Sequence, residues 1–314
     1  MSEPVFITLT PETLAKEHLC CIIRSRKPHP GVEAKRQWLA ERLKEGHVFR
    51  KLDVKGCAFI EYAPLETAWV PIVGENYLYI YCLWVTGALK GCGYGRALME
   101  SCLADARARG RSGVCMLGAQ TQKAWLSDQS FAGKFGFKTV DTTPGGYTLL
   151  ALSFDGSRPA FSPNAKRETI ENRGLTVYYS LQCPYIPQRV ETLRAYCAER
   201  EIPASFVPVD SLEKAKALPC PFNNWAVFYE GRFQTVNQID GPALERILKR
   251  GKAHGDQQGI SGIYAGSALR AGRRNGSQRC RFLLLFLSGH HSGIHLEPHG
   301  SRRGQAGGSD EHRF

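Results

Sequence analysis

The sequence predicts an α/β (α+β) protein of two domains followed by an irregular tail. First, 43% of its 314 residues are apolar and 10% are aromatic, which is enough for the cores of two ordinary domains. Second, short β-branched or aromatic runs alternate with helical patterns on both sides of a polar linker at 156–173. Third, this periodicity is lost from residue 251 onward.

The first domain is expected to span residues 1–155. Its first half is expected to hold a strand, two helices and two antiparallel strands, at residues 5–9, 13–23, 32–45, 48–54 and 57–62. Thr10, Pro11 and Glu12 before the first helix are typical of a helix start. The second half continues with a strand, a helix, a strand, a helix and two strands, at residues 77–85, 96–109, 113–118, 123–134, 135–140 and 147–154.

The second domain is expected to span residues 174–250. Strand, helix, strand, helix, two strands and a closing helix are predicted at residues 175–181, 188–201, 204–209, 212–217, 226–230, 233–238 and 241–250. Residues 251–314 hold 13 glycines and six of the nine histidines, so we interpret them as a disordered tail or as sequence translated out of frame. The spacing of these histidines matches no closed metal site, and no metal is expected.

The formal net charge of +12 does not by itself indicate a nucleic-acid partner. The tail contributes nine Lys and Arg residues against four Asp and Glu residues, so the remaining excess is spread thinly over two domains. Such an excess suits an anionic cofactor at least as well as a nucleic acid. No nucleic-acid partner is therefore expected.

The cysteines and the amino terminus point to the cytoplasm. Several of the eleven cysteines lie inside apolar strand or helix patterns, where a free thiol behaves as a small core side chain. The first residues, Met-Ser-Glu-Pro, lack the basic and apolar regions of a signal peptide. The longest strongly apolar run, at 282–287, is too short to cross a bilayer, so no membrane partner is expected.

The stretch at 77–100 combines a buried strand, a glycine-bearing loop and the beginning of a helix. Gly91, Gly93 and Gly95 allow backbone amides to approach a ligand, and the helix N-terminus adds unpaired N–H groups that favour anions. The stretch contains no GxxxxGK[ST] phosphate loop. It is not the dinucleotide pattern GxGxxG either, because Arg96 stands where the last glycine would be.

The spacing Lys90-x-x-Gly93-x-Gly95 resembles the acetyl-CoA pyrophosphate loop, [Q/R/K]-x-x-G-x-[G/A], of the GNAT N-acetyltransferases. Residues 131–137, FAGKFGF, resemble the family's aromatic-x-x-K-x-G-F segment. The run CLWVTGALKGCGYG is similar to that of GNAT proteins with a YoaP-like C-terminal domain. The resemblance extends from residue 1 to about 250.

The resemblance implies a GNAT acyl-CoA N-acyltransferase fold with a mixed, mostly antiparallel sheet, followed by a thioredoxin-like domain. It implies an enzyme that uses acetyl-CoA to acetylate an amine of a small molecule or peptide. The expected cofactor-binding residues come from the strand and from the loop after it: Leu83, Trp84, Val85, Lys90, Gly91, Cys92, Gly93, Tyr94, Gly95 and Arg96.

Acetyl transfer to an amine needs a general base, and the sequence offers two carboxylates for it. Glu61 comes late in its strand and Glu75 precedes the next one, and the residues do not decide between them. The family's usual proton donor to the leaving thiolate is a Tyr, but Ala132 occupies that position here. Ser127 or Ser130 could replace it, and a thiolate can also leave without a positioned acid.

A different function class is suggested by Cys183. The run Cys183-Pro184-Tyr185-Ile186 resembles the CPYC site of glutaredoxins, with Ile in place of the second Cys. A helix N-terminus following this run is expected to lower the pKa of the Cys183 thiol. The alternative is therefore a monothiol redox or thiol-sensing protein whose GNAT domain only binds CoA.

Overall fold

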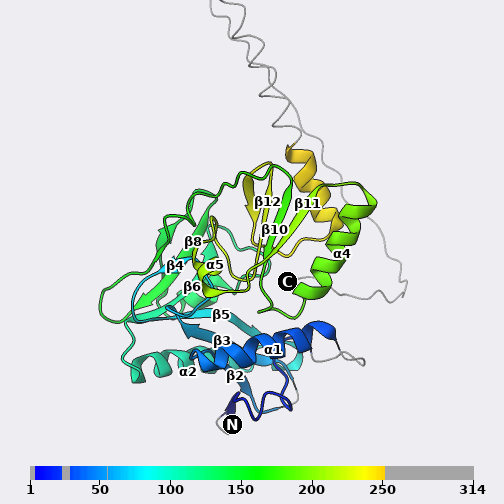
Figure 1. The fold of residues 1–314 in the computed structure, drawn as a ribbon. Helices are drawn as coiled ribbons and strands as arrows, with labels where there is room; N and C mark the ends of the chain where they lie inside the picture. The colour runs from blue at the N-terminus through cyan, green and yellow to red at the C-terminus, as the bar shows by residue number, and fades with distance from the viewer. Residues whose placement is uncertain (1–3, 23–28, 55, 252–314) are drawn as a thin grey trace, which may run out of the picture. The chain divides into compact units, whose positions relative to one another are not determined.

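The computed structural model describes residues 4–22, 29–54 and 56–251 (Figure 1). The predictions made for the tail lie outside these residues. Within them, no helix is both long enough and apolar enough to cross a membrane.

A seven-stranded sheet forms the larger domain, in the order β1-β2-β3-β5-β6-β8-β7. Its strands are β1 (Phe6–Thr8), β2 (Val48–Leu52), β3 (Ala58–Pro64), β5 (Tyr77–Val85), β6 (Gly113–Ala119), β7 (Lys138–Thr142) and β8 (Tyr147–Ser153). Among the described strands of this sheet, β5 and β6 are the parallel pair and the other neighbours run antiparallel. The prediction of a mixed, mostly antiparallel sheet is confirmed.

Two helices cover opposite faces of this sheet, because successive strand residues point to opposite sides. The helix α2 (Tyr94–Ala108) packs its apolar stripe on the face that carries Ile60 and Ile80. The helix α1 (Pro30–Lys44) packs with Phe59 on the other face. Side chains of the second domain join this second cluster, including Phe222 and Phe228.

The second domain has a four-stranded sheet in the order β11-β10-β12-β13. Its strands are β10 (Leu175–Tyr179), β11 (Ala204–Pro208), β12 (Trp225–Tyr229) and β13 (Arg232–Thr235). β10 and β11 are parallel, whereas β12 and β13 run antiparallel to their neighbours. The helix α4 (Ile186–Glu199) and a helix at 241–251 share one apolar cluster with this sheet, and α5 (Leu212–Lys216) contributes Ala215 to the cluster shared with the larger domain.

The connecting stretch 156–173 is itself folded. Within it, β9 (Ala160–Phe161) pairs with β4 (Ile72–Val73), and Phe161 and Ala165 are buried in a core cluster of the larger domain. The described residues of both domains belong to one compact unit.

Two predicted helices are wrong in whole or in part. Residues 11–16 form turns rather than a regular helix, although the Leu14 and Glu17 amides donate to the Thr10 and Thr13 carbonyls (2.9 and 3.1 Å). The second half of the predicted helix holds His18, Cys20 and Cys21, which are weak helix formers. The helix predicted at 123–134 shortens to α3 (Gln129–Gly133). Trp125 adopts a left-handed φ of 67°, which a helix does not permit, and Asp128 then caps the late start.

Candidate active site

The loop after β5 leaves a set of backbone amides free. A short 3₁₀ turn, η1 (Gly87–Leu89), follows the strand, and α2 begins directly after Gly93. Gly91 and Gly93 have φ of 79° and 82°, the left-handed region that favours glycine. A Cβ added to either would meet nothing within 4 Å, so the space above the loop is open. No side chain caps α2, and its first amides can therefore bind an anion.

The charged side chains of this loop are exposed. Lys90 lies in the loop itself, and Arg96 lies in the first turn of α2 beside Glu100 (3.5 Å). Cys92 is exposed and donates its thiol hydrogen to the Ala88 carbonyl (3.4 Å). The two cations can therefore add screened attraction to an anion held by the backbone amides.

The two parallel strands separate halfway along β5. Tyr77–Ile80 of β5 pair with β6 in register. Beyond this point β6 stays paired with β8, and β5 stays paired with β3, but β5 and β6 no longer pair with each other. The register between β3 and β5 shifts at the same place, since Tyr62 faces Ile80 and Glu61 faces Cys82, which leaves Tyr81 as a bulge. Residues 81–85 of β5 thus form a splayed edge, free of β6.

Side chains of Ser127 and Asn223 make hydrogen bonds to the backbone of the splayed edge. The Leu83 amide donates to Ser127 Oγ at 3.4 Å, and Asn223 Nδ2 donates to the Tyr81 carbonyl at 3.2 Å. The expected cofactor-binding residues Leu83, Trp84 and Val85 are half-buried along this edge. Of the proposed catalytic residues, the structure brings Ser127 to this edge, and Glu61 of β3 lies opposite Cys82 in the strand register.

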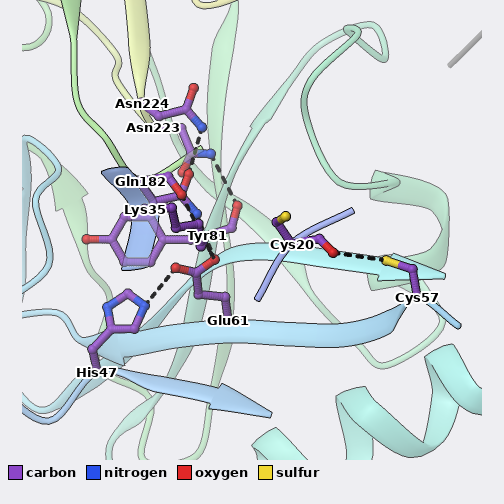
Figure 2. Close-up of polar contacts among 9 residues, drawn as sticks. All are labelled: Cys20, Lys35, His47, Cys57, Glu61, Tyr81, Gln182, Asn223 and Asn224. Atoms are coloured by element: carbon purple, nitrogen blue, oxygen red, sulfur yellow. Dashed lines mark hydrogen bonds and ion pairs between the residues drawn. The ribbon is translucent and has the colours of Figure 1, made fainter. Parts of the chain in front are cut away.

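Glu61 lies in a buried polar cluster (Figure 2). Its Oε2 is 2.6 Å from Lys35 Nζ and accepts from Gln182 Nε2 at 2.8 Å, and its Oε1 is 3.0 Å from His47 Nε2. Lys35 also donates to the Gln182 carbonyl at 2.7 Å. Burial alone would raise the pKa of Glu61, but the charge of Lys35 and the His47 hydrogen bond together lower it below its usual value. The carboxylate is therefore ionised, and both of its oxygens are occupied.

The remaining catalytic candidates lie away from the splayed edge or have other contacts. Glu75 is exposed and precedes β5, whose nine residues separate it by roughly 30 Å from the glycine loop at the other end. The Ser130 hydroxyl donates to Asp128 (2.7 Å) within the cap of α3. Ala132, which occupies the position expected for a tyrosine proton donor, is fully buried in the core.

The expected lowering of the Cys183 pKa is wrong. Burial raises the pKa of this thiol, and a hydrogen bond with Gln238 and the charge of Lys35 offset that only in part. The helix α4 begins at Ile186, so Cys183 lies before its cap and outside the first turn. A thiol with a raised pKa holds little thiolate at neutral pH and is a weak nucleophile.

A group of amide side chains from the second domain was not predicted from the sequence. Asn224 Nδ2 donates to Gln182 Oε1 (2.8 Å), which extends the Glu61 cluster, and Gln238 Nε2 contacts Asn224 Oδ1 (3.4 Å). Asn223, next in the chain, contacts β5 instead. These residues form no local motif, so no sequence pattern marked them. Gln182 and Asn223, which contact the larger sheet, lie more than 100 residues from their partners in β3 and β5.

No metal centre accompanies these residues: the part of the chain that the structure describes contains no group of three or more His, Cys, Asp or Glu placed to hold an ion.

Comparison with known proteins gives two family matches and one curated relative. Residues 13–137 match the acetyltransferase (GNAT) family, and residues 203–246 match the YoaP-like family. The chain is 33% identical over 245 residues to an uncharacterized N-acetyltransferase, YoaP, of Bacillus subtilis (strain 168). The alignment covers 77% of this chain and 98% of that protein.

Solved structures are similar to about half of the chain. A GNAT family acetyltransferase from Brucella melitensis in complex with acetyl-CoA is 16% identical with a TM-score of 0.35, covering 51% of this chain and 94% of its own. The ribosomal-protein-S18-alanine N-acetyltransferase of Escherichia coli is 16% identical with a TM-score of 0.33, covering 48% and 94%.

Proposed function

Since this chain belongs to the GNAT family of acetyltransferases and carries a YoaP-like second domain, it is an acetyl-CoA-dependent N-acetyltransferase, and we propose that the loop at 90–96 and the splayed edge of β5 hold its acetyl-CoA. The observation that carries this proposal is their continuity. The strand edge that its parallel neighbour has left is followed by one 3₁₀ turn and then by an uncapped helix N-terminus with two left-handed glycines. A diphosphate with a long amide-bearing arm is complementary to both parts.

The position of the acetyl group follows from this arrangement. With the pyrophosphate on the amides of Gly91 and of residues 93–96, the pantetheine arm runs back along β5 from Val85. The four residue steps from Val85 to Tyr81 span about 13 Å. The thioester would then lie near Tyr81 and Leu83, beside Ser127. In the proposed site Leu83, Trp84 and Val85 line the arm, and Lys90 and Arg96 add charge near the phosphates.

In the proposed reaction a neutral amine attacks the thioester carbonyl. A C–N bond forms, the C–S bond breaks, and the CoA thiolate leaves with the electron pair. We assign Ser127 the role of hydrogen-bond donor to that sulfur, because its Oγ already accepts from the Leu83 amide and its own hydrogen is left to donate. Glu61 is poorly suited to take the amine proton, since its oxygens are occupied and its pKa is lowered. We infer that this proton passes to water.

We further propose that the second domain is thioredoxin-like and shapes the acceptor side, rather than acting as a redox centre. The sheet order β11-β10-β12-β13, with the first two strands parallel, supports the fold. The raised pKa of Cys183 disfavours thiol chemistry. The acceptor is a small-molecule or peptide amine. Ten free cysteines in the described chain support a reducing compartment, the cytoplasm.

Titration calorimetry with acetyl-CoA tests the proposed site. Wild-type protein is expected to bind acetyl-CoA, and Gly93→Glu is expected to weaken binding at least tenfold, about 1.4 kcal/mol, because it places a carboxylate where the phosphates lie. Gly110→Glu is the matched control. Gly110 follows the C-cap at the far end of the same helix, has a φ of 60° and also has open space around it, so the backbone strain is similar but the site is remote. Equal losses in both variants, or no binding by the wild type, would contradict the proposal.

A further inference from the structure

One side chain of the second domain contacts the point where β5 leaves β6. Asn223 lies before β12 and is only 7% exposed. Its Oδ1 accepts from the Tyr79 hydroxyl at 2.9 Å, and its Nδ2 donates to the Tyr81 carbonyl at 3.2 Å (Figure 2 shows the second contact). A carbonyl can only accept, so the amide nitrogen must face Tyr81 and the amide oxygen must face Tyr79.

The two partners of Asn223 lie on either side of the separation point. Tyr79 belongs to the paired part of β5, opposite Cys115 of β6, whereas Tyr81 is the bulged residue at which the splayed edge begins. Tyr81 is also held at its other end, because its hydroxyl accepts from the Trp69 amide at 2.6 Å. The bulge is therefore fixed by a backbone amide on one side and by Asn223 on the other.

The segment that presents Asn223 is itself held firmly. Phe222 is 1% exposed in the core shared by the domains. The Asn224 carbonyl accepts from the Ser180 amide (3.0 Å), and its side chain donates to Gln182 of the Glu61 cluster. The neighbouring side-chain amides of Asn223 and Asn224 thus connect the second domain to β5 and, through Gln182, to β3. Such support is what keeps a contact residue in one geometry.

We propose that Asn223 is a positioning residue for acetyl transfer, which fixes the Tyr81 carbonyl and the bulge against which the acetyl group lies, so that the two domains share one acetyl site. This inference rests on the proposed function, which places the thioester near Tyr81. It assigns the second domain a part in the chemistry of the first. Acetyl-CoA and CoA differ only in the acetyl group on the sulfur. Their relative affinities therefore test the acetyl site even though the acceptor is not identified.

The test compares the affinities of acetyl-CoA and CoA for the full chain and for Asn223→Asp. Asp keeps the size of Asn and can accept from Tyr79, but it places an anion against the Tyr81 carbonyl. A thioester oxygen can only accept hydrogen bonds and is repelled there, whereas the CoA thiol is a weak donor. We expect Asn223→Asp to lower the affinity for acetyl-CoA by a factor at least about five times larger than the factor for CoA, a difference of about 1 kcal/mol in binding free energy. Asn223→Ala, which buries no charge, is expected to shift the ratio in the same direction.

The matched control is Thr235→Ala. Thr235 Oγ1 is 3.3 Å from the Tyr147 hydroxyl, a hydrogen bond between the same two domains that involves no residue of β5. This variant is expected to leave the affinity ratio unchanged. An unchanged ratio in both Asn223 variants, with wild-type protein binding acetyl-CoA, would overturn the inference alone. Absence of acetyl-CoA binding in the wild type would overturn the proposed function with it.

Discussion

The carboxylate of Glu61 joins three parts of the chain at a single buried point. Lys35 comes from α1, His47 precedes β2, and Gln182 comes from the second domain. Lys35 and Glu61 are 2% and 0% exposed, so neither charge is hydrated if its partner is removed. Burial also lowers the pKa of His47, which leaves the ring neutral and Lys35 as the counter-charge of Glu61.

Lys35→Met should therefore destabilise the fold strongly. We expect the free energy of unfolding at pH 7 to fall by about 3–5 kcal/mol, because Glu61 is left as an uncompensated buried charge. Urea unfolding measures this difference. The folded pKa of Glu61 is lowered, so the stability from this pair is present above the unfolded pKa and is lost as the pH falls through the folded value. The gap between wild type and variant should accordingly narrow in acid.

Lys44→Met provides the control for this prediction. Lys44 pairs with Glu41 on the same helix, but the two side chains are 67% and 59% exposed. Removing an exposed pair of this kind changes stability by less than about 1 kcal/mol. Equal losses in the two lysine variants would show that the Lys35–Glu61 pair is not buried as described.

Residues close together in the sequence were predicted better than residues brought together by folding. The glycines of the loop were identified from six consecutive positions, and the structure gives Gly91 and Gly93 the left-handed φ that requires glycine. Asn223 and Gln182 follow no such pattern, since each is an ordinary polar residue in its own segment. Their contacts with β3 and β5 form only when the second domain folds against these strands.

At the scale of the element, the start of α2 depends on two glycines that serve different purposes. Gly93 has a φ of 82°, so glycine is needed for its backbone conformation. Gly95 lies inside the helix, and a Cβ there would make ordinary contacts of 3.6 Å with Phe131 and 3.7 Å with Val85. The two positions should therefore respond to alanine in opposite ways.

Gly93→Ala is expected to lower the free energy of unfolding by about 1–2 kcal/mol, the cost of a left-handed conformation in a residue with a Cβ. Gly95→Ala is expected to raise it by about 0.5–1 kcal/mol, because alanine is the better helix former and the site has room. Urea unfolding of both variants measures the difference. A loss of stability in Gly95→Ala would mean that α2 packs more tightly on β5 than these contacts indicate.

Element boundaries were predicted well where a periodic pattern decides the structure, and poorly where side chains compete with the backbone. The predicted helix at 96–109 became α2, because its apolar stripe packs on the sheet. The predicted helix at 123–134 lost its first half. There the Gln122 side chain donates to the Lys123 and Leu126 carbonyls, and Trp125 turns left-handed. This turn places Ser127 at the splayed edge, where we propose that it donates a hydrogen bond to the CoA sulfur.

At the scale of the whole molecule, the second domain packs closely on the first. A Cβ on Gly31, at the start of α1, would collide with the Pro184 carbonyl before α4. His29 and Gln188 make a hydrogen bond of 3.1 Å across the same contact. The sequence predicted two domains from their separate periodic patterns, but periodicity describes only how each domain buries its own apolar face. It carries no information on which polar side chains meet between them.

Lys216 offers a pH-dependent test of this contact. From α5 it donates to the Leu65 carbonyl (2.7 Å) and the Ile72 carbonyl (3.2 Å) of the first domain. Burial lowers the pKa of Lys216 to about 8, below the usual value of 10.5. Between these values the unfolded chain binds more protons than the folded protein, so the contribution of Lys216 to stability rises with pH. The amine keeps hydrogens to donate after it loses its charge.

We therefore expect the difference in unfolding free energy between wild type and Lys216→Met to shift in favour of the wild type by roughly 1 kcal/mol from pH 8 to pH 9. Both proteins contain the same cysteines and tyrosines, so the titration of these groups cancels in the difference between their unfolding free energies. Lys214→Met is the control, since Lys214 lies on the same helix, is 57% exposed and pairs with Asp210 at 2.6 Å. Its difference from wild type should stay constant over this range. A constant difference for Lys216→Met as well would mean that water reaches this lysine, and that the contact between the domains is looser there than at Asn223.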